Sequence, residues 1–139
     1  MKLKTSIVLS ILTLALAVTA GCAQKASERI VGKWSIDTAK TEALEDIKSL
    51  SEDKRGAALA LVQKLATTTT FEIAPGKLTT DTAGQKTERA FTITGETGYQ
   101  VVCESKVDGK VEHGTLTFQG ETLVLNQSNP KMTVALVRK

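Results

Sequence analysis

Apolar and polar residues alternate along most of the chain after Thr67, and turn sequences interrupt this alternation at regular intervals. The alternating segments are rich in threonine and valine, which favour strands. The turn sequences are Pro75-Gly76, Ala83-Gly84, the TGETG loop at 94–98, Asp108-Gly109, Gln119-Gly120 and Asn129-Pro130. Turn sequences at such regular intervals predict an antiparallel meander of seven strands. The Asp-Gly pair is the strongest hairpin signal, because both central residues of a type I′ turn need a positive φ.

The turns also predict which residues face each other across the sheet. Two-residue turns at Pro75-Gly76, Asp108-Gly109 and Gln119-Gly120 and a four-residue loop at 127–130 give these pairs: Ile73 with Leu78, Phe71 with Thr80, Val101 with Leu116, Tyr99 with Phe118, Leu116 with Leu123, Leu125 with Met132, and Leu123 with Val134. A slip of one residue would turn any of these strands to the wrong face. Because the pairs keep the apolar residues on one side, they predict a single apolar interior.

The segment before the meander predicts one more strand, followed by two helices. In RIVGKWSID, Ile30, Trp34 and Ile36 share one face of a strand. Helical spacing follows over about 39–66, with one apolar stripe on each side of a break near Ser51. The sequence therefore predicts a mainly β fold, an eight-stranded antiparallel up-and-down barrel with a two-helix insertion between its first two strands. The alternative is an open, curled sheet with the helices on its concave face.

The first and last strands carry a pattern that resembles that of the calycins, the group that contains lipocalins and fatty-acid-binding proteins. The pattern lies in VGKWSID and VALVRK, where its residues are Gly32, Trp34 and Arg138. The resemblance implies a lipocalin-like barrel over 30–138, with the indole of strand one packed against the arginine of the final strand. The helix pair after the first strand is closer to fatty-acid-binding proteins, and the lipocalin Thr-Asp-x-x-Asn-Tyr motif is absent from the sequence. The chain as a whole resembles small bacterial lipoproteins of uncharacterised function.

The N-terminus has the composition of a secretory signal peptide. Two lysines stand within the first four residues, an apolar run covers 6–18, and residues 19–21 are small. This apolar run is too short for a membrane-spanning helix, which needs roughly 20 residues. The TAGC sequence resembles the bacterial lipobox, which predicts cleavage after residue 21 and acylation of Cys22. Acyl chains on Cys22 would hold the protein at a membrane, and Ala23 rather than aspartate resembles an outer-membrane signal, on the periplasmic face.

Cleavage would divide the chain into a signal peptide at 1–21, a lipidated cysteine with its tether at 22–29, and one barrel domain at 30–139. Loss of the two signal lysines leaves 16 basic residues against 15 acidic ones, so the sequence predicts no surface for nucleic acid. Acylation would also use Cys22, which leaves Cys103 without a disulfide partner. The sequence shows no metal-ligand spacing, cofactor motif or catalytic relay, so we expect neither an enzyme nor a cofactor or metal.

Alternation assigns the interior residues to one of the two ends of the predicted barrel. The end next to Trp34 and Arg138 collects an apolar plug: Ile73, Leu78, Ile93, Tyr99, Phe118 and Leu136. The other end is more polar and contains Thr69, Thr80, Thr87, Arg89, Cys103, Ser105, Glu112, Leu125 and Met132. Gly114 lies opposite Cys103 and leaves room, whereas His113 points outward opposite Glu104. Apolar walls with a few polar groups are typical of ligand sites at barrel mouths, and the helix pair would cover this one as a lid.

The candidate ligand site consists of seven residues at this polar end: Arg89, Ser105, Cys103, Glu112, Thr80, Thr87 and Met132. We expect Arg89 to bind a carboxylate or another anionic head group, with Ser105 and the threonine hydroxyls adding hydrogen bonds. Alternatively, Arg89 and Glu112 form an ion pair at a solvated rim and bind nothing.

Together these patterns predict a monomeric, non-catalytic lipoprotein of the cell envelope that binds or sequesters a small amphiphile. The alternative is an envelope module that binds or inhibits another protein and whose barrel is completely filled. An empty interior of several hundred cubic ångströms would favour ligand binding. Full packing around Phe71, Phe91 and Met132 would favour the protein-binding module.

Overall fold

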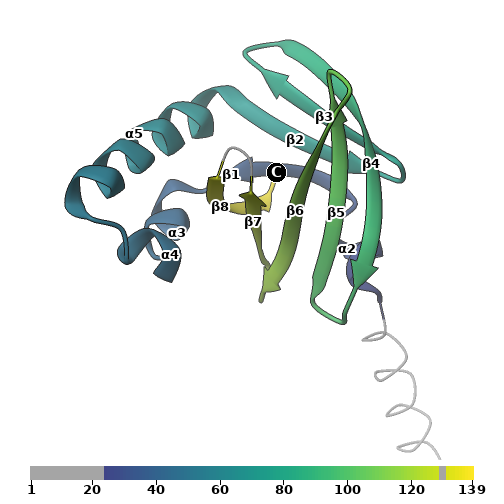
Figure 1. The fold of residues 1–139 in the computed structure, drawn as a ribbon, viewed down its shortest axis with the longest axis horizontal. Coiled ribbons are helices and arrows are strands. Elements are labelled where there is room, and N and C mark those ends of the chain that lie inside the picture. Colours follow the sequence, from purple (N-terminus) through teal and green to yellow (C-terminus); the bar gives the residue numbers. More distant parts are fainter. Residues whose placement is uncertain (1–23, 129–130) are drawn as a thin grey trace, which may run out of the picture.

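The computed structural model describes residues 24–128 and 131–139, which form a closed barrel of eight antiparallel strands (Figure 1). The strands are β1 (Gly32–Ile36), β2 (Thr69–Ala74), β3 (Lys77–Thr82), β4 (Gln85–Glu96), β5 (Gln100–Val107), β6 (Lys110–Gln119), β7 (Thr122–Ser128) and β8 (Lys131–Arg138). Each strand pairs with the next, and β8 pairs with β1, so the predicted up-and-down barrel is confirmed and the open sheet is wrong. This architecture is compatible with a calycin-like fold. The predicted signal peptide, its cleavage site and Cys22 lie outside the described residues.

Three helices connect β1 to β2 where the sequence predicted two. They are α3 (Thr38–Glu42), α4 (Glu45–Lys48) and α5 (Glu52–Thr68). Asp37 caps α3, because its carboxylate accepts a hydrogen bond from the backbone N–H of Lys40 at 2.9 Å. The extended backbone at Leu44 separates α3 from α4, and the predicted break near Ser51 is confirmed because α5 begins directly after it. Over the described part of the chain, none of the helices combines the length and apolar character needed to cross a membrane.

The short helices pack on the outer face of the barrel, over β7 and β8. Thr41 of α3 is fully buried, and its hydroxyl accepts a hydrogen bond from the backbone N–H of Ala135 at 2.9 Å. In α4, the carboxylate of Asp46 accepts a hydrogen bond from the amide of Asn126 at 3.4 Å. The predicted lid is therefore wrong for this half of the insertion. Only α5 reaches the interior, where Leu65 from its last turns joins the apolar residues inside the barrel.

Several predicted pairings across the sheet are confirmed. Ile73 lies opposite Leu78 in the first hairpin, and Val101 lies opposite Leu116 in the hairpin that follows Asp108-Gly109. Asp108 has a φ of 50° and Gly109 a φ of 76°, as the predicted type I′ turn requires.

The predicted register is wrong by two residues on both sides of β7. The structure pairs Leu116 with Leu125, Leu125 with Val134, and Leu123 with Leu136. The reason is the position of the turns. The turn after β6 consists of Gly120 and Glu121 rather than Gln119 and Gly120, and only two residues, not four, separate β7 from β8. A shift of two residues keeps every side chain on its face, so the assignment to the interior survives.

The barrel has two different ends, which we call the base and the mouth. The base is formed by the helical turn α2 (Ala26–Arg29) with the β4–β5 and β6–β7 turns, and the mouth by the β3–β4 and β5–β6 turns (Figure 1). The sequence treated 22–29 as a tether without regular structure. Instead, Ala26 is fully buried and Ile30 is 1% exposed, so this segment belongs to the base. Their contacts come from strands distant in sequence, which is why local composition did not reveal them.

Trp34 is the centre of the packed base. Its side chain is fully buried, its indole N–H donates to the carbonyl of Ile30 at 2.8 Å, and the guanidinium of Arg138 lies 4.4 Å from its ring centre. The ring of Phe118 lies 6.3 Å away in a tilted arrangement. Gly32 has a φ of 139°, and a Cβ added there would lie 2.6 Å from an Nη atom of Arg138. The residues of the calycin-like pattern are therefore in mutual contact.

Two residues of the predicted plug are exposed, and three others, Ile73, Leu78 and Leu136, line the open interior of the mouth half instead of packing only at the base. Tyr99 lies opposite Phe118 as expected, yet its side chain is 60% exposed, because it sits in the turn before β5. Ile93 is 39% exposed although it pairs with the buried Cys103, and the register between β4 and β5 shifts directly after it, between Ile93 and Gly95. This bulge bends the end of β4, so strict alternation fails there.

Candidate ligand-binding site

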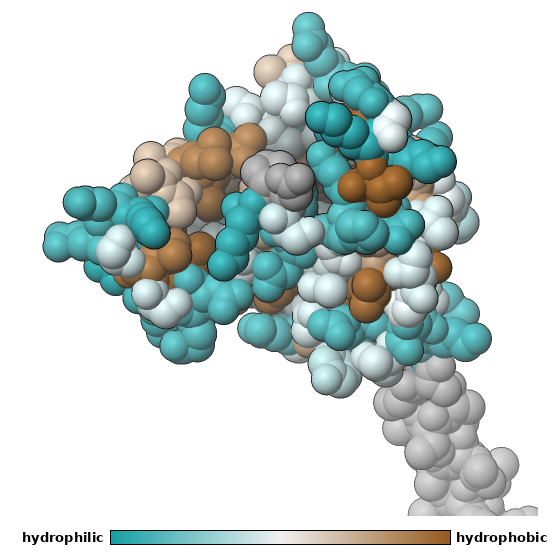
Figure 2. Space-filling view, in the orientation of Figure 1, coloured by the Kyte–Doolittle hydropathy of each residue, from teal (hydrophilic) through white to brown (hydrophobic). Residues whose placement is uncertain are grey.

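A cavity of about 350 Å³ occupies the half of the barrel towards the mouth. Its apolar wall comes from nearly every strand and from α5: Leu65, Phe71, Ile73, Leu78, Phe91, Leu116, Leu125, Met132 and Leu136. Its polar lining is smaller and comprises Thr69, Thr80, Thr82, Arg89, Cys103, Ser105, Glu112 and Gln127, and His113 borders it although its side chain is 62% exposed. Figure 2 shows apolar residues gathered along α5 where the helix faces the barrel. The interior is therefore not filled by its own side chains.

Six of the seven residues of the predicted site line this cavity: Arg89, Ser105, Cys103, Glu112, Thr80 and Met132. The seventh, Thr87, is exposed and does not contribute to the lining. Its partner across the sheet, Thr80, does line the cavity, so the prediction is wrong for Thr87 alone.

Besides His113, which borders the cavity with an exposed ring, the sequence missed the lining residues Leu65, Thr82 and Gln127. Gln127 was assigned to a loop, although it shares the parity of Leu123 and Leu125 and could have been found from it. Leu65 carried a helical signal but no indication of which end of the barrel it would face.

Arg89 and Glu112 form the charged part of the lining. An Nη atom of Arg89 lies 3.5 Å from a carboxylate oxygen of Glu112, and the same oxygen accepts a hydrogen bond from the amide of Gln127 at 3.4 Å. The two charged side chains are 30% and 24% exposed, so water screens their attraction in part, and the pair contributes at most about 1 kcal/mol. The ion pair that the sequence offered as an alternative is thus present.

Arg89 also has an Nε donor, which takes no part in this ion pair. Its Nε atom is buried, and within the described residues it has no hydrogen-bond partner. A buried donor without a partner costs about 1–3 kcal/mol, more when the group is charged. An acceptor that entered the cavity and reached Nε would remove this cost, which favours an anionic or strongly polar ligand group at this position.

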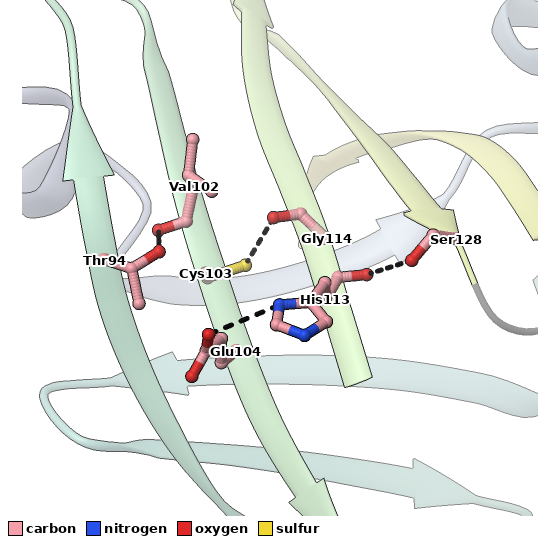
Figure 3. Close-up of polar contacts among 7 residues, drawn as sticks. All are labelled: Thr94, Val102, Cys103, Glu104, His113, Gly114 and Ser128. Atoms are coloured by element: carbon pink, nitrogen blue, oxygen red, sulfur yellow. Dashed lines mark hydrogen bonds and ion pairs between the residues drawn. The ribbon is translucent and has the colours of Figure 1, made fainter. Parts of the chain in front are cut away.

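Cys103 faces the cavity, and its neighbour His113 faces outward (Figure 3). The thiol donates to the carbonyl of Gly114 at 3.4 Å, and burial raises the pKa of Cys103 to about 11. It therefore stays protonated at neutral pH and acts as part of the wall. Nδ1 of His113 lies 3.3 Å from a carboxylate oxygen of Glu104, as the sequence predicted.

Gly114 has a steric role beside the thiol. A Cβ there would lie 3.3 Å from the carbonyl oxygen of Asn126 and 3.9 Å from the sulfur of Cys103. Its lack of a side chain lets β6 and β7 approach closely and keeps this part of the interior open.

The described part of the chain offers no group of three or more His, Cys, Asp or Glu side chains that could hold a metal ion. Comparison with protein-family models, with curated protein sequences and with solved structures gives no match for this chain. A functional proposal therefore rests on the geometry of the barrel.

Proposed function

We propose that this protein binds a small amphiphile whose chain occupies the apolar cavity and whose anionic head group meets Arg89. The observation that carries this proposal is the combination of about 350 Å³ of open, mostly apolar interior with a buried Nε donor in its wall that has no partner among residues 24–128 and 131–139. Ligand pockets in proteins measure about 300–1,000 Å³ and are lined mainly by apolar side chains with a few polar groups. The cavity fits the lower end of this range.

The chemistry of the lining favours a carboxylate or a similar anion. A guanidinium offers donors in a planar fork, and carboxylates accept from two of them at once. Glu112 engages only one Nη atom, at 3.5 Å. A ligand carboxylate would accept from Nε and compete with Glu112 for Nη, while the hydroxyls of Ser105 and Thr80 line the same cavity.

The membrane anchor belongs to the proposal as well. Acylation of Cys22 would hold the protein at the cell envelope, with the outer membrane as the proposed location. We propose that the anchored protein acts without catalysis, by sequestering its ligand. The alternative of a completely filled barrel that only binds another protein has less support, because the interior around Phe71, Phe91 and Met132 borders a cavity.

Calorimetric titration of the mature chain, with Cys22 replaced by serine, tests the role of Arg89. Decanoate and decanol serve as probes, because they share a chain and differ only in the head group. Arg89→Met should weaken decanoate binding about tenfold or more, since hydrogen bonds to charged groups contribute about 1.5–3 kcal/mol, and should leave decanol binding unchanged. Lys86→Met, an exposed position on the same strand, is the matched control.

Two results would contradict the proposal. Equal losses of decanoate affinity in Arg89→Met and Lys86→Met would show a general charge effect rather than a site. Absence of heat with both probes, combined with a native mass spectrum of protein from its host that contains no small molecule, would favour the protein-binding module.

A further inference from the structure

The N-terminal segment is attached firmly to the base of the barrel. The backbone N–H of Ser27 donates to a carboxylate oxygen of Glu96 at 2.7 Å, at the end of β4. Hydrogen bonds from the side chain and the backbone of Ser27 hold the pKa of Glu96 below its ordinary value. The charged carboxylate therefore persists at neutral pH and keeps α2 next to the β4–β5 turn.

Two arginines fix the same segment from the other side. Arg138 donates to the carbonyl of Val31 at 3.0 Å and to the carbonyl of Arg29. The guanidinium of Arg29 lies 3.9 Å from the ring centre of Phe118, in β6. Because these contacts come from three different strands, the path of the chain between Ser27 and Val31 cannot rotate independently of the barrel.

The connection from this fixed segment to Cys22 is short compared with the barrel. The three residues 23–25 separate Cys22 from α2, so the four steps from Cys22 to Ala26 reach at most about 14 Å when extended. The strand β6 has 10 residues. At a rise of about 3.4 Å per residue and a tilt of about 40°, it spans roughly 25 Å between base and mouth. An anchor at Cys22 therefore holds the base close to its membrane.

The surface of the base has side chains that suit a membrane interface. Tyr99 is 60% exposed in the β4–β5 turn, and Val31 is 40% exposed directly after α2. Lys25 and Lys33 are exposed beside them. Tyrosine is enriched at membrane–water interfaces. The exposed acids Glu28, Glu96 and Glu121 of the same end offset the charge of the lysines, so Tyr99 and Val31 are the side chains that suit the interface.

We propose that the base rests on the bilayer that holds the acyl chains of Cys22, so that the mouth faces away from this bilayer. This inference rests on the lipid anchor in the proposed function, but not on the identity of the ligand. It implies that ligand enters and leaves on the aqueous side, where the exchange partner is a soluble carrier or a facing membrane rather than the leaflet under the protein.

Fluorescence quenching in vesicles tests this orientation. The lipidated full-length protein is purified from bacterial membranes, with Cys103→Ala as background, and labelled through either Lys110→Cys at the mouth or Glu121→Cys at the base. Both positions are exposed, and Lys110 is the first residue of β6 whereas Glu121 lies in the turn that follows this strand. Lipids with a nitroxide on the head group should quench the base label several-fold more strongly than the mouth label, and aqueous iodide should show the reverse order.

The controls separate the orientation from the anchor. A long Gly/Ser insertion between Ala23 and Gln24 should abolish the excess quenching of the base label, because it frees the base from the bilayer. Failure of the protein to float with vesicles would overturn both the anchor and the orientation. Flotation with equal quenching at the two labels, or with stronger quenching at the mouth, would overturn the orientation alone and leave ligand binding intact.

Discussion

The base and the mouth of this barrel are built from the same strands, but their interiors differ. At the base, Trp34 is fully buried between Arg138 and Phe118, and its polar atom has a partner at 2.8 Å. At the mouth, the strands surround about 350 Å³ of open interior, and Arg89 keeps a buried donor without a partner within the described residues.

The base therefore contributes most to stability, whereas the half towards the mouth provides the cavity for a ligand. Close packing and satisfied hydrogen bonds make the base the part of the barrel whose alteration costs most free energy of unfolding. The half towards the mouth is packed less closely, because the side chains around an open cavity lack van der Waals contacts on that side. Substitutions at the two ends should therefore produce different classes of effect, which the following predictions examine in order of expected size.

The largest effect should follow removal of the indole. Trp34→Ala should lower the free energy of unfolding by about 3–5 kcal/mol, because it deletes a fully buried aromatic side chain and leaves a cavity. Urea unfolding followed by circular dichroism measures this loss. Tyr99→Ala, at a 60% exposed aromatic residue of the base, should change stability by no more than about 0.5 kcal/mol. Similar losses in both variants would contradict the assignment of the core to Trp34.

The thiol in the cavity provides a probe of the other end. With Cys22 replaced by serine, Cys103 is the single thiol of the chain. Its pKa rises from 9.0 to about 11 on burial, so at pH 8 the folded protein has roughly 100-fold less thiolate than the unfolded chain. Alkylation by iodoacetamide, followed by mass spectrometry, should therefore be slower by at least that factor in buffer than in urea.

The same shift makes folding sensitive to alkaline pH. The unfolded chain loses the thiol proton first, as the pH passes 9.0, whereas the folded chain keeps it until about 11. This contribution to stability is complete below pH 9 and is lost as the pH rises through that window. Equal alkylation rates in buffer and in urea would show that Cys103 is not buried.

A smaller effect at the base should follow from Gly32→Ala. The backbone φ of 139° is unfavourable for alanine, and the new Cβ would approach an Nη atom of Arg138 to 2.6 Å. We expect a loss of about 1–3 kcal/mol in urea unfolding. The same substitution at Gly56, inside α5 with open space around it, should instead stabilise the protein by up to about 1 kcal/mol. If the free energy of unfolding changes in the same direction in both variants, the close approach of Arg138 to Gly32 is not the reason why position 32 requires glycine.

Local patterns predicted the strands well but could not fix every register. The Asp108-Gly109 turn was predicted correctly because both residues have the positive φ that a type I′ turn requires. At Gly120 the sequence allowed the glycine to be either the first or the second residue of the turn. The two choices differ by two residues in pairing and give the same interior, so alternation alone could not distinguish them.

Features that depend on distant contacts were the ones that the sequence missed. α2 belongs to the base because Arg138 and Glu96 hold it, and α3 lies on the outer face because Thr41 bonds to Ala135. Alternation depends only on the local sequence and predicts which residues face the interior, so it found most of the candidate site. It could not show that Arg89 retains a buried donor without a partner in the part of the chain that the structure describes.

The smallest predicted effect concerns Glu112, the partner of Arg89 at the mouth. Glu112→Gln should raise the affinity for decanoate by about two- to fivefold, because it removes a carboxylate that competes with the ligand for the guanidinium, and a partly exposed pair contributes about 1 kcal/mol or less. Calorimetric titration measures the change. Glu88→Gln is the matched control, since Glu88 pairs with Lys77 at 3.3 Å and both side chains are at least half exposed. Weaker binding of decanoate in Glu112→Gln, with Glu88→Gln unchanged, would mean that Glu112 positions Arg89 for the ligand instead of competing with it.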